Sequence, residues 1–432
     1  MHLSAFVSAF KTPDLRRKLL FTLGIIGVFR IGSLIPTPGV DYGAVQRCVA
    51  NVDQNPVFGL INLFSGGALL QLSVFALGIM PYITASIILQ LLTVVIPRLE
   101  MLKEEGSSGQ AKITQYTRYV TIGLGLLQAT SILTLARTPG RLIPGCNEDL
   151  IPSDSIFAFV IMIIVLTAGT SAVMWLGELV TERGVGNGMS IMIFTSIIAT
   201  FPGQLTNIFQ VNGFFTLAAV LAVGIATIGF VVLIEQAQRR IPVQYAQRQV
   251  GRKTYGGNST YIPLKVNMAG VIPVIFASSI LYVPSLIVNL SGSTAPWAQW
   301  IANNFSTGTE PFYLALYFFM IIFFAYFYVS ITFNPEKVAD DMKRYGGFIP
   351  GIRAGKPTAD YLKYVLDRLM APGSLYLGII ALIPFFAFSG LGVTQSFIFG
   401  GTSLLIMVGV GLDTVKQIES QLQQRSYEGF LK

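Results

Sequence analysis

The sequence is poor in the residues on which soluble domains and most enzymes depend. Only 12% of its 432 residues are charged, against about 25% in an ordinary soluble domain. The single histidine, His2, stands next to the N-terminus, so histidine-based metal binding or acid–base catalysis inside the protein is excluded. The two cysteines, Cys48 and Cys146, form no CxxC motif, and neither GxSxG nor HExxH occurs. We therefore expect no catalytic site and no resident metal or cofactor.

Hydrophobic residues make up 53% of the chain. They come in blocks of about 20, the length of helix needed to cross about 30 Å of hydrocarbon. Ten blocks predict transmembrane helices at 19–35, 74–96, 114–136, 156–177, 186–206, 213–234, 268–290, 312–333, 371–392 and 396–415. FPGQ (201–204) and FSGLG (388–392) divide two long uncharged runs into pairs of spans. The N-terminal KTPDLRRKLLFTLGIIGVF lacks a small-residue cleavage site, so we interpret it as an uncleaved first span. The fold class is an all-α polytopic membrane protein.

The positive charges predict how the chain is oriented in the membrane. Nearly all of the 29 Lys and Arg residues lie before span 1, in the even-numbered connections or in the C-terminal tail. The odd-numbered connections hold only Arg47, Arg137 and Arg141, and Arg30 lies within span 1. Because cytoplasmic loops carry the excess of Lys and Arg, both termini are predicted to be cytoplasmic.

Two predicted cytoplasmic connections, 238–267 and 335–370, are far longer than a turn requires. In the first, VQYAQ and STYIPL flank a GGN turn, which predicts a β-hairpin projecting into the cytosol. Loops of this length are usually functional, and their basic residues suit an acidic docking partner or RNA phosphates. The alternative is that these charges only fix the topology.

An apolar stripe favours a passive pathway over ion-coupled transport. Ile79, Ile83 and Ile87 follow one another at helical spacing, as pore-lining or ordinary packing residues do. A secondary transporter of small solutes, the main alternative, normally needs ionisable groups at mid-membrane. Arg30 is the only charge clearly within a span, and it lies near the outer end, where it can reach water. A scaffold or insertase without a pore is a further alternative.

Several long motifs resemble the SecY family, the channel subunits of the bacterial Sec protein translocase. They are INLFSGGALLQLSVFALGIMPYITASI, WLGELVTERGVGNGMSIMIF, PLKVNMAGVIPVIFASS, YGGFIPGIRAGKPTADYL and GTSLLIMVGVGLDTVKQIESQL. The resemblance covers essentially the whole chain. It implies two inverted five-helix halves, 1–206 and 207–432, around an hourglass pore and hinged at FPGQLTNIFQVN. It also implies a multi-pass protein of the bacterial plasma membrane that passes unfolded secretory chains and is no enzyme.

The resemblance further assigns sites and partners to this chain. It implies a hydrophobic pore ring of Ile79, Ile83, Met189, Ile193, Ile272 and Ile406. It implies a lateral gate, formed mainly by 74–96 and 268–290, that releases apolar segments into the bilayer. It implies docking of the SecA motor ATPase or the ribosome at Arg239, Arg240, Arg252 and Arg353. The other implied partners are the small subunits SecE and SecG, signal peptides, secretory preproteins and membrane lipids.

The interrupted segment before span 2 is predicted to close the channel. Residues 57–73 are too short and too rich in Gly and polar groups to make a comfortable lipid-facing span, and backbone of this kind is tolerated only inside protein or against a water-filled cavity. In the SecY resemblance they are the plug, a half-helix that includes Asn62, Phe64, Ser65, Gly66 and Gly67.

The two cysteines both fall in predicted outer connections, the only compartment here in which a disulfide would persist. Two readings remain open for them. Cys48 and Cys146 are either two unrelated small residues, or a disulfide that ties the outer loops of the N-terminal half together.

Overall fold

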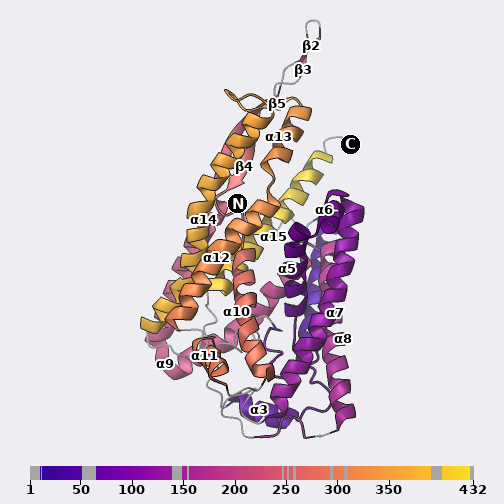
Figure 1. The fold of residues 1–432 in the computed structure, drawn as a ribbon, viewed down its shortest axis with the longest axis vertical. Coiled ribbons are helices and arrows are strands. Elements are labelled where there is room, and N and C mark those ends of the chain that lie inside the picture. The colour runs from indigo at the N-terminus through magenta and orange to yellow at the C-terminus, as the bar shows by residue number, and fades with distance from the viewer. Residues whose placement is uncertain are drawn as a thin grey trace.

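The computed structural model shows an elongated bundle of long helices with a β-hairpin projecting from one end (Figure 1). It describes residues 10, 12–50, 65–138, 148–152, 155–245, 248–250, 253–255, 259–291, 295–305, 310–390 and 401–428. The helices are α2 (Pro13–Leu34), α3 (Tyr42–Ala50), α5 (Met80–Val95), α6 (Pro97–Glu104), α7 (Ser107–Arg137), α8 (Ile156–Arg183), α9 (Gly188–Gln236), α10 (Ile272–Ser291), α11 (Pro296–Phe305), α12 (Pro311–Thr332), α13 (Pro335–Arg344), α14 (Lys356–Gly390) and α15 (Gly401–Glu428).

Each of the ten predicted spans overlaps one of these helices or one part of α9. By length and apolar composition alone, six described helices could cross a membrane, or seven if α5 and α6 are taken together. The other expected spans fall short because α2 and α15 carry charged ends and the qualifying part of α10 is short. Pro97 begins α6 after an extended Ile96, so α6 turns away from α5 by 102°.

The junction between spans 5 and 6 differs from the prediction. FPGQ was expected to end span 5, but Pro202 lies inside α9 and the helix continues to 210. The break is at Gly213, whose φ of 82° and ψ of 178° are essentially restricted to glycine. A long helix can contain a proline, whereas the backbone conformation at Gly213 needs a residue without a Cβ. The boundary predicted at 206/207 therefore lies before the observed break.

The start of span 2 also differs from the prediction. The helix was expected from Val74, but residues 66–79 form turns and α5 begins at Met80. Gly66, Gly67 and Gly78 have positive φ in these turns. Pro81 therefore lies in the first turn of α5, where its missing N–H costs no hydrogen bond. The described part of the predicted plug, 65–73, is made of turns rather than a regular helix, and 57–64 lies outside the described residues.

The predicted hairpin is confirmed. β1 (Gln238–Tyr245) pairs antiparallel with β4 (Ser259–Lys265), and the short β2 (Arg248–Val250) and β3 (Lys253–Tyr255) pair beyond them. The second long connection joins the same unit, because β5 (Gly347–Phe348) pairs with the end of β1. Apolar residues from both connections form a small core beneath the sheet: Ile241, Val243, Leu264, Met342, Ile349 and Leu362.

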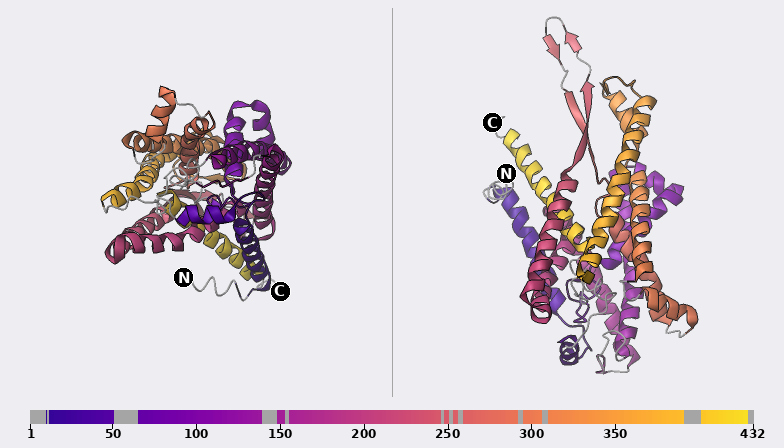
Figure 2. Two further views of the ribbon diagram at one scale, coloured as in Figure 1. Left: turned by 90° about the horizontal axis from the view of Figure 1, so that it is seen from below. Right: turned by 90° about the vertical axis from the view of Figure 1, so that its left-hand side faces the viewer.

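The elements expected on the two sides of the membrane lie at opposite ends of the bundle. The hairpin, α6, α13 and the C-terminal end of α15 lie toward one end, and α3 and α11 lie at the other (Figures 1 and 2). A large apolar cluster runs between them and takes residues from α2, α5, α8, α9, α10, α12, α14 and α15. The helices of both predicted halves therefore share one core.

Candidate functional site

Six apolar side chains from distant parts of the sequence belong to this core. Ile79, Ile83, Ile193 and Ile406 are buried within the large apolar cluster, and Met189 and Ile272 are partly buried against it. They come from the turn before α5, from α5 itself, and from α9, α10 and α15. All six residues of the predicted ring therefore belong to one apolar cluster, four from the predicted N-terminal half and two from the C-terminal half.

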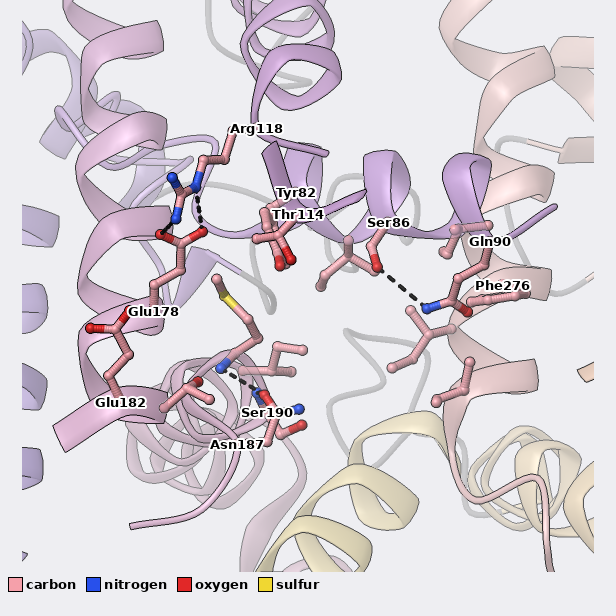
Figure 3. A pocket seen from close by; sticks show the side chains of 17 residues that line it. Tyr82, Ser86, Gln90, Thr114, Arg118, Glu178, Glu182, Asn187, Ser190 and Phe276 are labelled. Carbon is pink, nitrogen blue, oxygen red and sulfur yellow. Dashed lines mark hydrogen bonds and ion pairs between the residues drawn. The ribbon is translucent and has the colours of Figure 1, made fainter. Parts of the chain in front are cut away.

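A cavity of about 410 Å³ lies directly beside these residues (Figure 3). Ile83, Met189, Ile193 and Ile272 form part of its wall. The remaining lining is mostly polar: Tyr82, Ser86, Gln90, Thr114, Arg118, Glu178, Thr181, Glu182, Asn187 and Ser190, with Ile87, Ile275 and Phe276. The cavity thus has a polar wall and an apolar edge, the arrangement expected where a water-filled space ends at a hydrophobic constriction.

A bidentate ion pair on the cavity wall was missed in the sequence. Arg118 Nε donates to Glu178 Oε1 at 2.9 Å and Arg118 Nη2 donates to Glu178 Oε2 at 2.8 Å, joining α7 to α8 (Figure 3). Arg118 was counted with the cytoplasmic connection although it falls inside the predicted span 114–136. That position was the available signal, since an arginine within a span usually faces a polar cavity or a partner.

The turns before α5 are tied to the end of α2. Arg30 Nη1 donates to the Gly66 carbonyl oxygen at 2.9 Å. The Thr37 amide donates to Leu72 O at 3.0 Å, and Val74 N donates to Ile35 O at 2.9 Å. The sequence predicts that Arg30 reaches outward to water, whereas its side chain is half-buried and its guanidinium holds the backbone of this segment.

The members of the predicted plug divide between described and undescribed residues. Ser65 is fully buried, and its Oγ accepts a hydrogen bond from Leu69 N at 3.1 Å. A Cβ at Gly66 would lie 3.0 Å from Arg30 Nη1 and 3.2 Å from the Ser196 Cα on α9, so the backbone approaches both closely. Asn62 and Phe64 lie outside the described residues.

The two helices of the predicted lateral gate touch each other. α10 contacts α5 and α7 on one side and α12 on the other. Phe276 of α10 packs edge-to-face on Phe324 of α12, with ring centroids 5.7 Å apart. Pro273 is the second residue of α10 and so begins the helix, while Pro284 lies inside it.

Three of the four predicted docking arginines are described, and they lie at the end of the molecule that carries the hairpin. Arg239 and Arg240 on β1 are exposed, as is Arg353 in the second connection. The Arg240 guanidinium lies 4.8 Å from the centre of the Tyr261 ring, which keeps the side chain along the strand. Arg252 lies outside the described residues.

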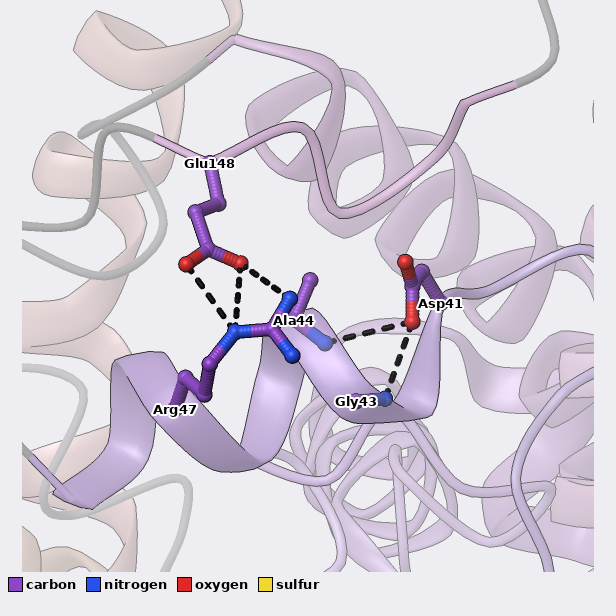
Figure 4. A network of polar contacts seen from close by, with 5 residues as sticks. All are labelled: Asp41, Gly43, Ala44, Arg47 and Glu148. Carbon is purple, nitrogen blue, oxygen red and sulfur yellow. Dashed lines mark hydrogen bonds and ion pairs between the residues drawn. The ribbon is translucent and has the colours of Figure 1, made fainter.

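An exposed ion pair links two outer segments at the opposite end (Figure 4). Arg47 on α3 donates from Nη2 to Glu148 Oε2 at 2.8 Å, and Asp41 Oδ1 accepts from the Gly43 and Ala44 amides at the start of α3. The hydrogen bond from Arg47 lowers the pKa of Glu148 below its usual value of 4.5, and the same pair raises the pKa of Arg47.

The cysteine next to this pair is bonded. Cys48 is buried and takes part in a disulfide. Cys146 lies outside the described residues, so its pairing with Cys48 stays a prediction. Within the described part of the chain, no group of three His, Cys, Asp or Glu side chains is placed to hold a metal ion.

Comparison with known proteins decides the family. The SecY family model matches residues 73–415. The chain belongs to the SecY family. It is 64% identical to a protein translocase subunit SecY of Streptomyces scabiei, and 57% identical to that of Mycobacterium tuberculosis, over the full length of all three chains.

Solved structures agree on the fold at low sequence identity. A structure described as a protein-conducting channel is 18% identical, with a TM-score of 0.64, over 94% of this chain and 92% of the other. A Sec61 channel from a canine ribosome–channel complex is 17% identical, with a TM-score of 0.61 and the same coverage.

Membership of the SecY family establishes the main expectations drawn from the sequence. The protein is a multi-pass channel subunit of the Sec protein translocase in the bacterial plasma membrane, with the SecY fold of ten spans. It is a protein-conducting channel and not an enzyme. As a translocase subunit it works within a Sec complex. The secondary transporter and the pore-free scaffold are thereby set aside.

Proposed function

We propose that unfolded secretory polypeptides cross the membrane between the two halves of this chain, 1–206 and 207–432. The observation that supports this proposal is that Ile83, Met189, Ile193 and Ile272 line one cavity with a largely polar set of residues. Ile79 and Ile406 belong to the same apolar cluster as these four. Apolar side chains exclude water and ions by dewetting, and they yield to a passing chain because they make no directional bonds. This ring is the proposed seal and the proposed passage.

The turns before α5 are the proposed plug beneath the ring. Arg30 holds Gly66 near α2, and Ser65 lies buried beside them. A solved structure with a TM-score of 0.62 and 18% identity bears the description that the plug domain of SecY stabilises the closed state and maintains a membrane seal. In this chain the same role falls to the segment around 57–73.

Apolar segments of the passenger are proposed to leave sideways between α5 and α10. The two helices touch without a described hydrogen bond between their side chains, so separating them costs mainly apolar contact. Ser86 and Gln90 of α5 face the cavity near Phe276 of α10 (Figure 3), which offers a signal peptide both polar and apolar surface. Membrane lipids receive the released segment.

The driving force is proposed to come from SecA or the ribosome, with SecE and SecG as small partner subunits. Arg239, Arg240, Arg252 and Arg353 are the proposed docking residues, presented by the hairpin unit at one end of the molecule. A relative of known structure was solved in a ribosome–channel complex. Basic side chains of this kind suit acidic protein surfaces and RNA phosphates.

Reconstitution tests this function. Vesicles containing the channel complex, SecA and a signal-bearing precursor should protect the precursor from added protease only when ATP is supplied. Absence of ATP-dependent protection would reject the proposal. Reversing the four docking arginines to Glu should weaken SecA binding about tenfold or more, and raised salt should weaken the wild-type interaction. Reversing Arg16, Arg17, Arg98 and Arg344, which are also exposed, gives the control with the same net charge.

A further inference from the structure

The projecting hairpin is continuous with the membrane helices at its root. β1 and β4 stay paired to their last residues, Gln238 opposite Lys265, and Val266 N then donates to Ala237 O at 3.0 Å. β1 follows the end of α9 after a single residue, and the chain reaches α10 within six residues of Val266. A displacement of the hairpin is therefore passed directly to its root, because few residues separate the paired strands from the membrane helices.

One buried side chain organises this root. Asn267 is 3% exposed, and its Nδ2 donates to Glu235 Oε1 at 2.6 Å and to Gly270 O at 3.1 Å. Glu235, itself buried, lies in the last turn of α9, and Gly270 has a φ of 62° just before α10 begins at Ile272. A single amide group thus fixes the end of β4, the end of α9 and the turn into α10.

A second tie joins the root to α15. Lys265 Nζ lies 3.6 Å from Asp413 Oδ1, and Asp413 lies two helical turns after Ile406. On α14, Gly373 lies against the Val266 carbonyl so closely that a Cβ would overlap it. The root is thereby held against α9, α14 and α15. Two helices next to the root carry proposed ring residues: α10 begins with Ile272, and α15 carries Ile406.

We propose that Asn267 is a positioning residue that transmits movement of the hairpin to the pore ring. Docking on the hairpin shifts β4, and the Asn267 amide carries that shift to the start of α10 and so to Ile272, five residues on. The Lys265–Asp413 pair carries it to α15 and Ile406. This inference rests on the proposed function, because it takes the hairpin as the docking element and the ring as the seal.

The test separates docking from its consequence. For Asn267→Ala in the reconstituted complex, SecA should bind with unchanged Kd, while the precursor translocated per ATP hydrolysed should fall roughly tenfold. Glu235→Gln keeps an oxygen acceptor for the Asn267 amide and should stay close to wild type. Lys265→Gln removes an exposed ion pair without threatening the fold, and it should lower the same ratio by a smaller factor. A wild-type ratio in both Asn267→Ala and Lys265→Gln would overturn the proposal.

A matched control identifies a merely structural role. Asn334 caps α13 in the neighbouring connection, where its Oδ1 accepts from the Glu336 and Lys337 amides. Asn334→Ala should lower the thermal midpoint but leave the translocation ratio unchanged. If Asn267→Ala instead weakens SecA binding and thermal stability together with the ratio, it acts on folding and the proposal fails. If the wild-type complex does not translocate at all, the proposed function has failed and not this inference alone.

Discussion

At the scale of single residues, the informative ones are the charges placed among apolar helices. Arg30 and Arg118 both lie within predicted spans, and each has a specific partner. Arg118 joins two helices through Glu178 on the cavity wall, whereas Arg30 holds the backbone of the turns before α5. A charge at such depth is costly unless it is paired, so these contacts explain why the two arginines are tolerated.

Removing the Arg30 guanidinium should loosen the proposed plug. Arg30→Gln removes the charged donor to Gly66 O, a kind of hydrogen bond that contributes about 1.5–3 kcal/mol. We expect resting ion leak through reconstituted channels to rise about tenfold, measured as potassium flux from loaded vesicles without SecA. Arg30→Lys keeps a charged donor and should leak less than Arg30→Gln. A glutamine variant as ion-tight as wild type would remove Arg30 from the sealing mechanism.

At the scale of elements, polar contacts restrain the segments that leave the bundle. The hairpin is joined to the second long connection through β5, so the two form one unit with its own core. At the opposite end, α3 is joined to the segment around Glu148 by Arg47 and carries the bonded Cys48. At both ends, polar contacts therefore hold the described segments against one another.

The outer pair predicts a pH dependence. The folded pKa of Glu148 lies below its usual 4.5 because Arg47 bonds the charged form. The restraint is therefore complete above pH 4.5 and is lost as the pH falls through the lower folded pKa. Since both groups are exposed, the effect on stability is small. Carbon-13 NMR of labelled glutamate should find this low pKa, and Arg47→Gln should return it to about 4.5; a titration unaffected by Arg47→Gln would contradict the pair.

The elements were largely predictable and their ends were not. Helix existence and the hairpin followed from apolar length and from alternation around turn residues. The breaks depended on backbone geometry: Pro81 begins α5 rather than bending it, and the reversal after span 5 is at Gly213 and not at Pro202. A proline at a helix start and a proline within a helix have the same local sequence signature.

At the scale of the whole molecule, the distribution of charge and the arrangement of the elements distinguish the same two ends. The strongly basic connections lie at the end with the hairpin, and the connections with few Lys and Arg lie at the end with α3 and α11 (Figure 1). Such an arrangement is what the positive-inside rule requires of a multi-pass protein. It also places the proposed docking residues and the Arg47–Glu148 pair on opposite sides of the bilayer.

Labelling from each side checks this orientation. In a background with both cysteines changed to Ser, single cysteines replace Ala354 and Gln46, which are both exposed. A membrane-impermeant maleimide should label Ala354→Cys in inverted vesicles and Gln46→Cys in right-side-out cells. The two variants control for each other, because the reverse pattern, or labelling of both from one side, would contradict the orientation.

The sequence by itself determined the class of molecule, its number of spans, its orientation and its family, because apolar length and charge sidedness are local properties of the chain. Only the tertiary structure decided which residues meet. The inclusion of Ile79, Ile193, Ile272 and Ile406 in one apolar core, and the contact of Arg30 with Gly66, depend on how helices far apart in sequence pack together. Packing of that kind is set by the shapes of all the side chains at once, and no single stretch of sequence encodes it.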